Sequence, residues 1–193
     1  KAKEKGQEKL RMRKGIVRGF FLIGIGYLLR IPFLSWFSGY FNSYFLVIDV
    51  LQCIGLSLII VVVLYYLCAK RVQLFSFILL ALGFLIFISE PLYRTISFDY
   101  LPTLLNNYVS KSNGSIFTIT PWFGYIAFGA YIATLFHKYS QIPHFKKITV
   151  ASFFVFGCIL IFSSSDILIL LHELMNIQLF LDAANYNYLF IRL

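Results

Sequence analysis

Residues 47–57 read Val-Ile-Asp-Val-Leu-Gln-Cys-Ile-Gly-Leu-Ser and lie near the start of an apolar run from Ser43 to Ala69. Asp49 is the one charged residue of this run, and Gln52 is its one side-chain amide. A helix needs roughly 20 apolar residues to cross a bilayer, so the run is long enough to do so. A carboxylate in such a helix costs up to ~2.5–3.5 kcal/mol on insertion scales, and less near the interface. Asp49 is therefore a candidate functional residue that requires a partner.

The composition of the whole chain agrees with a membrane protein. Of its 193 residues, 60% are hydrophobic and only 13% are charged. A soluble domain of this size cannot bury that much apolar surface, which excludes a soluble fold. The net charge of +9 would suggest nucleic acid in a soluble protein. Here most of the positive charge lies between apolar runs, so we expect membrane lipid and no nucleic acid as a partner.

The apolar runs predict an all-α fold, a polytopic transmembrane helix bundle with about five spans and the start of a sixth. The expected spans are residues 15–37, 43–69, 72–92, 120–136, 148–171 and 188–193, the last of them incomplete. They form a single integral-membrane domain, residues 1–193, which opens with a basic segment, residues 1–14. Because the chain starts at Lys1 rather than Met and stops inside an apolar run, we interpret it as an excerpt of a longer protein.

The positive charges predict the orientation of the bundle. Thirteen of the 17 Lys and Arg residues fall in three segments: eight of them in residues 1–18, two at 70–71 and three in 138–147. Loops rich in Lys and Arg stay on the cytoplasmic side of a membrane. We therefore expect a cytoplasmic N-terminal segment, an external loop at residues 93–120, and an integral protein of the bacterial inner membrane.

Polar residues at membrane depth give the candidate site. Arg30, Asp49, Gln52 and Trp122 all fall in the outer half of their expected spans or at its edge. Asp49, Gln52 and Cys53 are spaced i, i+3 and i+4, so they are expected to share one helical face that points into protein or a wet cavity. Arg30 either snorkels to the outer interface or pairs with a buried acid, and the sequence leaves both open. Trp122 is either an interfacial anchor or a stacking surface for a sugar.

Small residues predict where helices approach closely. Gly24 and Gly26 lie in the first span, and Gly129 with Ala133 forms a small-xxx-small pair in the fourth. Such residues let two backbones come together in a membrane. We therefore expect these positions at helix–helix contacts.

Two of these segments resemble a known family. Residues 48–57 resemble a helix of the heparan-α-glucosaminide N-acetyltransferase-like family, within the transmembrane acyltransferase superfamily. Residues 121–130, Pro-Trp-Phe-Gly-Tyr-Ile-Ala-Phe-Gly-Ala, resemble that family's later Pro-Trp-aromatic-Gly helix. The basic stretch 11–30, which leads into a Gly-rich span, is similar to the family's third helix and the loop before it. The family's first two helices, with an Asp-x-x-Arg-Gly signature and a histidine thought to be catalytic, have no counterpart here, so we expect the catalytic residue to lie outside this excerpt.

The resemblance implies transfer of an acyl group, acetyl above all, from cytoplasmic acyl-CoA to a sugar or glycan acceptor on the outer side. Acyl-CoA (acetyl-CoA) would be the co-substrate, and no metal is implied. Asp49 and Gln52 would orient the acceptor or the missing base, with Arg30 and Trp122 lining the same site. The acceptor's identity stays open, as does assembly into a homo-oligomer.

A non-enzymatic protein is the alternative, either a transporter or a structural subunit of a membrane complex. Intramembrane Asp and Arg residues also mark ion and substrate pathways. An inverted repeat would favour a transporter, and the sequence contains no evident repeat. The chain also lacks a phosphate loop, a dinucleotide fingerprint and a serine elbow, so it matches no common soluble enzyme.

Overall fold

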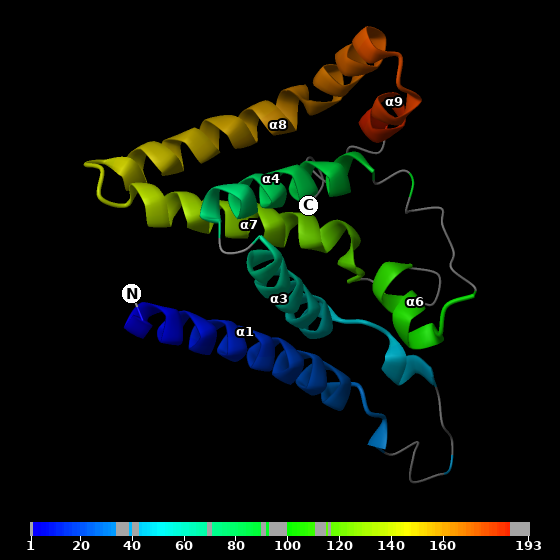
Figure 1. Ribbon diagram of the computed structural model, residues 1–193. Coiled ribbons are helices and arrows are strands. Elements are labelled where there is room, and N and C mark those ends of the chain that lie inside the picture. The colour runs from blue at the N-terminus through cyan, green and yellow to red at the C-terminus, as the bar shows by residue number, and fades with distance from the viewer. Residues whose placement is uncertain are drawn as a thin grey trace.

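A computed structural model describes residues 2–33, 39, 43–68, 71–89, 92, 100–110, 115 and 117–185. Within these ranges the chain is all-helical and contains no strand. The helices are α1 (Ala2–Leu29), the 3₁₀-helix η1 (Ser43–Leu46), α3 (Val50–Leu67), α4 (Val72–Ile88), α6 (Thr103–Val109), α7 (Ile119–Tyr139), α8 (Phe145–Met175) and α9 (Gln178–Asn185) (Figure 1). The predicted all-α class is confirmed.

Two antiparallel helix pairs form the body of the bundle. Helix α1 packs along α3, helix α4 packs along α7, and α3 joins the two pairs through its contact with α7. In Figure 1, α1 and α8 lie at opposite edges, and α9 folds back from α8 toward α4. The C-terminal end of α1 and the N-terminal ends of α3 and α7 gather with η1 and α6 at one end of the bundle, hereafter the Asp49 end. The other end, where α3 finishes and α4 begins, is hereafter the Tyr66 end.

The helices have the length and composition of a membrane bundle. Helices α3, α7 and α8 are each long and apolar enough to cross a bilayer, and the 17-residue α4 is apolar but shorter. Only 6% of the 18-residue apolar stretch of α8 is buried within the protein, and Phe162 on that helix is 80% exposed. A helix that exposes so much apolar surface needs lipid around it. The predicted polytopic bundle is therefore supported by the fold.

Helix bounds differ from the expected spans at several points. Helix α1 is continuous from Ala2, so the basic segment extends the first span instead of preceding it as a separate arm. Helix α3 begins at Val50 rather than at Ser43, because Asp49 serves as its N-cap in extended backbone geometry. Asp side chains favour such caps over helix interiors. The expected span at 188–193 lies outside the described residues.

Glycines set the closest helix contacts, although not all of those expected. A Cβ on Gly19 of α1 would lie 2.7 Å from the carbonyl oxygen of Gly55 in α3, and a Cβ on Gly55 would lie 2.6 Å from that of Gly19. Gly26 also contacts α3, whereas a Cβ on Gly24 would meet no atom of the described residues within 4 Å. The expectation for Gly24 was therefore wrong, because it lies on the opposite face of α1 from this seam.

The expectation for Gly129 was also wrong. Gly129 is exposed, and in the part of the chain that the structure describes no atom lies within 4 Å of a Cβ built there. The contact between α4 and α7 uses Gly83 and Gly124 instead, whose added Cβ atoms would lie 2.7 Å from the Phe128 ring and 2.9 Å from the Phe87 ring. The small residues that matter on α7 therefore lie on the face carrying Gly124, not on the face carrying Gly129.

Two hydrophobic clusters fill the bundle. The first lies between α3, α4 and α7 and contains the buried residues Cys68, Phe75, Leu79, Phe123 and Ala127. The second lies at the Asp49 end and contains the buried residues Ile48, Cys53 and Tyr108. The second cluster supports the candidate site.

Candidate acceptor site at the Asp49 end

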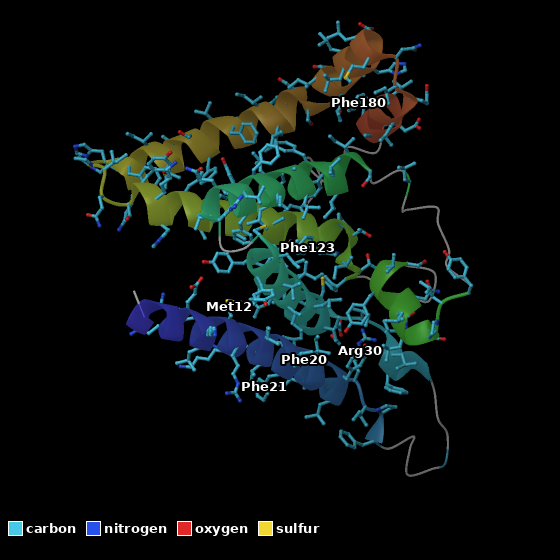
Figure 2. All side chains as sticks on the ribbon, in the orientation of Figure 1. Met12, Phe20, Phe21, Arg30, Phe123 and Phe180 are labelled. Atoms are coloured by element: carbon cyan, nitrogen blue, oxygen red, sulfur yellow. The ribbon has the colours of Figure 1, made fainter. Side chains whose placement is uncertain are left out.

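An ion pair between Arg30 and Asp49 is the centre of the site. Arg30 directly follows α1 and Asp49 directly precedes α3, so the antiparallel packing of these helices brings the two residues together. The Arg30 Nε donates to the Asp49 Oδ2 at 2.7 Å. The Arg30 side chain is 17% exposed and the Asp49 side chain 44% exposed. Of the two accounts left open for Arg30, which Figure 2 labels near the end of α1, the structure therefore shows pairing with an acid.

Gln52 holds the backbone of Asp49 at the start of α3. Its Oε1 accepts a hydrogen bond from the Asp49 backbone N–H at 3.1 Å, which is the Gln52 half of a capping box. The Gln52 side chain is fully buried. Its Nε2 has no hydrogen-bond partner among the described residues. Gln52 thus fixes the start of α3, and its Nε2 remains able to donate hydrogen bonds.

Gly26 of α1 makes room for this glutamine. A Cβ at Gly26 would lie 2.5 Å from the Gln52 Cδ and 2.6 Å from its Oε1. No side chain larger than hydrogen fits between the α1 backbone and the Gln52 amide without displacing it. The contact between Gly26 and Gln52 could not be predicted from the sequence, because it depends on the register of two separate helices.

Asp49 occupies a different position from the one expected. It caps α3 instead of lying inside the helix, and its carboxylate is half-exposed, whereas Gln52 and Cys53 are buried. The three residues therefore do not share one equally accessible face. The arrangement leaves Asp49 as the accessible member of the set.

Helix α6 forms a wall that sequence reasoning missed. The segment 93–120 was expected to be an external loop, yet it contains α6, whose Tyr108 packs against Ile48 and Cys53. The Tyr27 hydroxyl of α1 donates to the Tyr108 hydroxyl at 3.4 Å. Burial, followed by the bond to Tyr27, raises the pKa of Tyr108 well above its usual range, so this phenol stays protonated at neutral pH.

Two polar contacts tie this wall to the start of α3. The Asn107 Nδ2 donates to the Leu46 carbonyl oxygen at 2.9 Å, and the Ser115 Oγ accepts from the Ile48 N–H at 3.1 Å. Asn107 and Ser115 are both buried. The run Asn106-Asn107-Tyr108 was the feature from which this wall could have been predicted. Side-chain amides that become buried usually bond to backbone, and two adjacent amides before a tyrosine are suited to that role.

Trp122 lies on the other side of the same cluster. It packs against the residues around Cys53 and Tyr108 and is part-buried. Its ring centroid is 5.0 Å from that of Phe117 and 5.9 Å from that of Tyr125. Regular helical backbone in α7 begins just before it, after Thr120. Trp122 is thus held in an aromatic group with Phe117 and Tyr125.

Comparison with known families identifies the chain. The family model described as heparan-alpha-glucosaminide N-acetyltransferase, catalytic, matches residues 4–174. The chain belongs to this family. As a heparan-alpha-glucosaminide N-acetyltransferase family member it is a membrane protein with the helices expected of one, and Arg30, Asp49, Gln52 and Trp122 all lie within the matched region. Searches of curated proteins and of solved structures found no match to this family member.

Proposed function

We propose that the protein takes part in acetyl transfer from cytoplasmic acetyl-CoA to a sugar or glycan acceptor, and that the acceptor binds at the Asp49 end. The observation that carries this proposal is the half-exposed Asp49 carboxylate, held by Arg30, in a membrane protein of an acetyltransferase family. Charged residues at this depth are retained where they serve a site.

The chemistry of Asp49 suits a hydroxyl- or amine-bearing acceptor. A carboxylate accepts hydrogen bonds from such groups, and here one of its oxygens is already fixed by the Arg30 Nε. That bond restricts the rotation of the carboxylate and leaves its exposed edge for the acceptor. Orientation of this kind lowers the barrier to a two-substrate reaction. Asp49 is therefore proposed to bind the acceptor, and Arg30 and Gln52 to position Asp49.

The aromatic group around Trp122 would supply the apolar face of the site. Sugar rings present C–H faces that pack on aromatic rings, and Trp122 with Phe117 offers such a surface beside the cluster at the Asp49 end. A polar anchor on one side and an aromatic surface on the other is the usual composition of a small-molecule site.

The donor would approach from the opposite end of the bundle. The exposed residues Lys138, Lys146 and Lys147 flank the turn between α7 and α8 at the Tyr66 end, where they would attract the phosphates of CoA. Helix α3 alone separates the two ends by about 27 Å at 1.5 Å per residue. The acetyl group is thus proposed to reach the acceptor along the interior of the bundle.

In the transfer itself, the acceptor amine or hydroxyl attacks the thioester carbonyl carbon. A C–N or C–O bond forms, the C–S bond breaks, and the acceptor's proton leaves to a base and ends on the CoA sulfur. The resemblance implies that this base is the histidine found in the family's first two helices. His172 is a poor substitute, since its Nδ1 lies 2.9 Å from the Ile177 carbonyl oxygen at the end of α8.

Sealed vesicles that contain the full reading frame test the proposal. Radiolabelled acetyl-CoA is supplied on the cytoplasmic side, and amino sugars and glucosaminide-ended glycans are supplied on the other. The proposal predicts labelled acceptor on the far side, dependent on intact protein. If folded protein acetylates nothing across a broad acceptor panel, the proposed function is wrong, and uptake of unmodified acceptor would favour the transporter alternative.

A further inference from the structure

A groove between α1 and α3 at the Tyr66 end is not used by the proposed reaction. It has a volume of about 390 Å³ and opens at the side of the bundle. Two cations, Lys9 and Arg13, come from α1, and the remaining lining residues are Met12, Ile16, Val17, Val62, Val63 and Tyr66. None of these lining residues is acidic.

The lining residues are arranged in order along the groove. Lys9, Arg13 and Val17 are spaced by four residues, so they form one row along α1, with the cations nearer the N-terminus. Tyr66 comes from the last turn of α3, and Val62 and Val63 come from the turn before it. One end of the groove is therefore cationic with an aromatic phenol, and the other end is aliphatic.

The groove lies where a membrane surface would be. Helix α3 is apolar throughout and long enough to span a bilayer, so Tyr66 in its last turn falls at the interface. Tyr side chains favour that level. Gly15 of α1 contacts Val62, so Lys9 and Arg13 lie beside the last turns of α3 and the apolar half of α1 lies alongside the rest of that helix. Figure 2 shows Met12 on the side of α1 that faces α3 and Phe21 on the opposite side.

We infer that this groove binds one anionic phospholipid, with its phosphate at Lys9 and Arg13 and an acyl chain against Val17, Val62 and Val63. The sequence of chemistry along the groove, cation, then interfacial phenol, then aliphatic surface, is that of a glycerophospholipid. Val17 and Val63 are 58% and 42% exposed, so the aliphatic end offers uncovered apolar surface to the chain. The charge favours an anionic headgroup over a zwitterionic one.

Other basic residues of α1 provide a matched control. Arg11 and Lys14 are exposed on the same helix but do not line the groove. A general attraction of the basic helix for anionic membranes would depend equally on all four cations. A built lipid site depends on Lys9 and Arg13 alone.

The test uses the full-length protein in vesicles of phosphatidylcholine with one-fifth phosphatidylglycerol, extracted gently into detergent and examined by native mass spectrometry. The expected result is one retained phosphatidylglycerol per chain. The double variant Lys9→Gln/Arg13→Gln should weaken retention roughly 30-fold, whereas Arg11→Gln/Lys14→Gln should leave it unchanged. A third variant, Val63→Trp, fills the aliphatic end and should lower retention with both cations intact.

Three results would overturn the inference. Equal loss in both double variants would show a diffuse charge effect, and unchanged retention in Lys9→Gln/Arg13→Gln would show that lipid binds elsewhere. Displacement of the retained lipid by acetyl-CoA, with the same dependence on Lys9 and Arg13, would assign the groove to the acyl donor. Each variant's circular dichroism and elution profile show whether it is folded before retention is compared.

Discussion

At the scale of single residues, the Arg30–Asp49 pair is a compromise between burial and access. Arg30 is mostly covered, so its charge requires a partner, while Asp49 keeps almost half of its side chain exposed. A fully buried pair would lose several kcal/mol to desolvation, and a fully exposed one would contribute little. The intermediate burial keeps the carboxylate oriented and still accessible.

This balance makes a prediction about neutralising the pair. Arg30→Gln leaves the Asp49 carboxylate without its cation and should lower the free energy of unfolding by about 1–2 kcal/mol. The double variant Arg30→Gln/Asp49→Asn should recover most of that loss, because it removes both charges. Thermal unfolding in detergent measures both effects. If the double variant is as unstable as the sum of the single ones, the two side chains do not act as a pair.

A second prediction concerns the contact of Gly26 with Gln52. Gly26→Ala places a methyl group 2.5 Å from the Gln52 Cδ, so the amide must move or the helices must separate. The cost should be about 1–3 kcal/mol, and the capping of Asp49 should weaken with it. The melting temperature and the rate of acetyl transfer should both fall.

Gly24→Ala is the matched control for that substitution. It makes the same change two residues away, where the new methyl group meets nothing within 4 Å. Removal of a glycine from a helix interior should stabilise this variant by about 0.5–1 kcal/mol. Equal effects of the two substitutions would contradict the described register of α1 on α3.

At the scale of helices, glycine contacts decide how the bundle packs. The α1–α3 seam is closest at Gly19 and Gly55, where each glycine faces the other's backbone carbonyl. Backbone cannot rotate away as a side chain can, so this seam tolerates substitution least.

Gly19→Ala should therefore destabilise the protein by about 1–3 kcal/mol, since its methyl group would lie 2.7 Å from the Gly55 oxygen. Gly129→Ala on α7 should instead stabilise the protein by about 0.5–1 kcal/mol, as Gly24→Ala should, because that position is exposed and open. The melting temperatures of the two variants in the same detergent check the prediction. A larger loss for Gly129→Ala than for Gly19→Ala would show that the seams are assigned to the wrong faces.

The positions of the long helices could be predicted from the sequence, whereas the side of each helix that packs against its neighbours could not. The uninterrupted apolar run after Asp49 predicted α3 because few other structures hold so many apolar residues. The start of α3 was misplaced because the preceding residues are equally apolar and only Asp49 marks the cap. Helix α6 was missed because a seven-residue helix in a polar segment carries no periodic signal.

The site was predicted in part for the same reason. A charged residue is easily recognised in an apolar run, so Arg30 and Asp49 could be predicted from the sequence. In the structure they form an ion pair. Tyr27 and Tyr108 were not found, and Gly26 was expected at a helix contact but not beside Gln52, because each enters the site only through the packing of helices distant in sequence. Sequence alone does not give that packing.

At the scale of the whole molecule, the distribution of Lys and Arg predicts the orientation in the membrane. By the positive-inside rule we propose that the Tyr66 end lies in the cytoplasm. Cysteines introduced at Tyr100, which is 80% exposed before α6, and at Ser140, which is exposed after α7, should then react with impermeant maleimide from opposite sides. The parent, whose Cys53 and Cys68 are buried and whose Cys158 is part-buried, gives the background labelling to be subtracted. Labelling of both positions from one side would contradict the bundle topology.

The proposed function involves both ends of the molecule, and Asp49 is the residue on which it depends most. Asp49→Asn keeps a good N-cap residue and the size of the side chain, so the fold should survive. Asp166→Asn, the same change at an exposed position of α8, is the control. The decisive measurement is acetyl transfer from radiolabelled acetyl-CoA by the full reading frame carrying each substitution. The account predicts that Asp49→Asn slows transfer by roughly 10²–10⁴-fold while Asp166→Asn retains parental activity. A folded Asp49→Asn protein with parental activity would contradict the account.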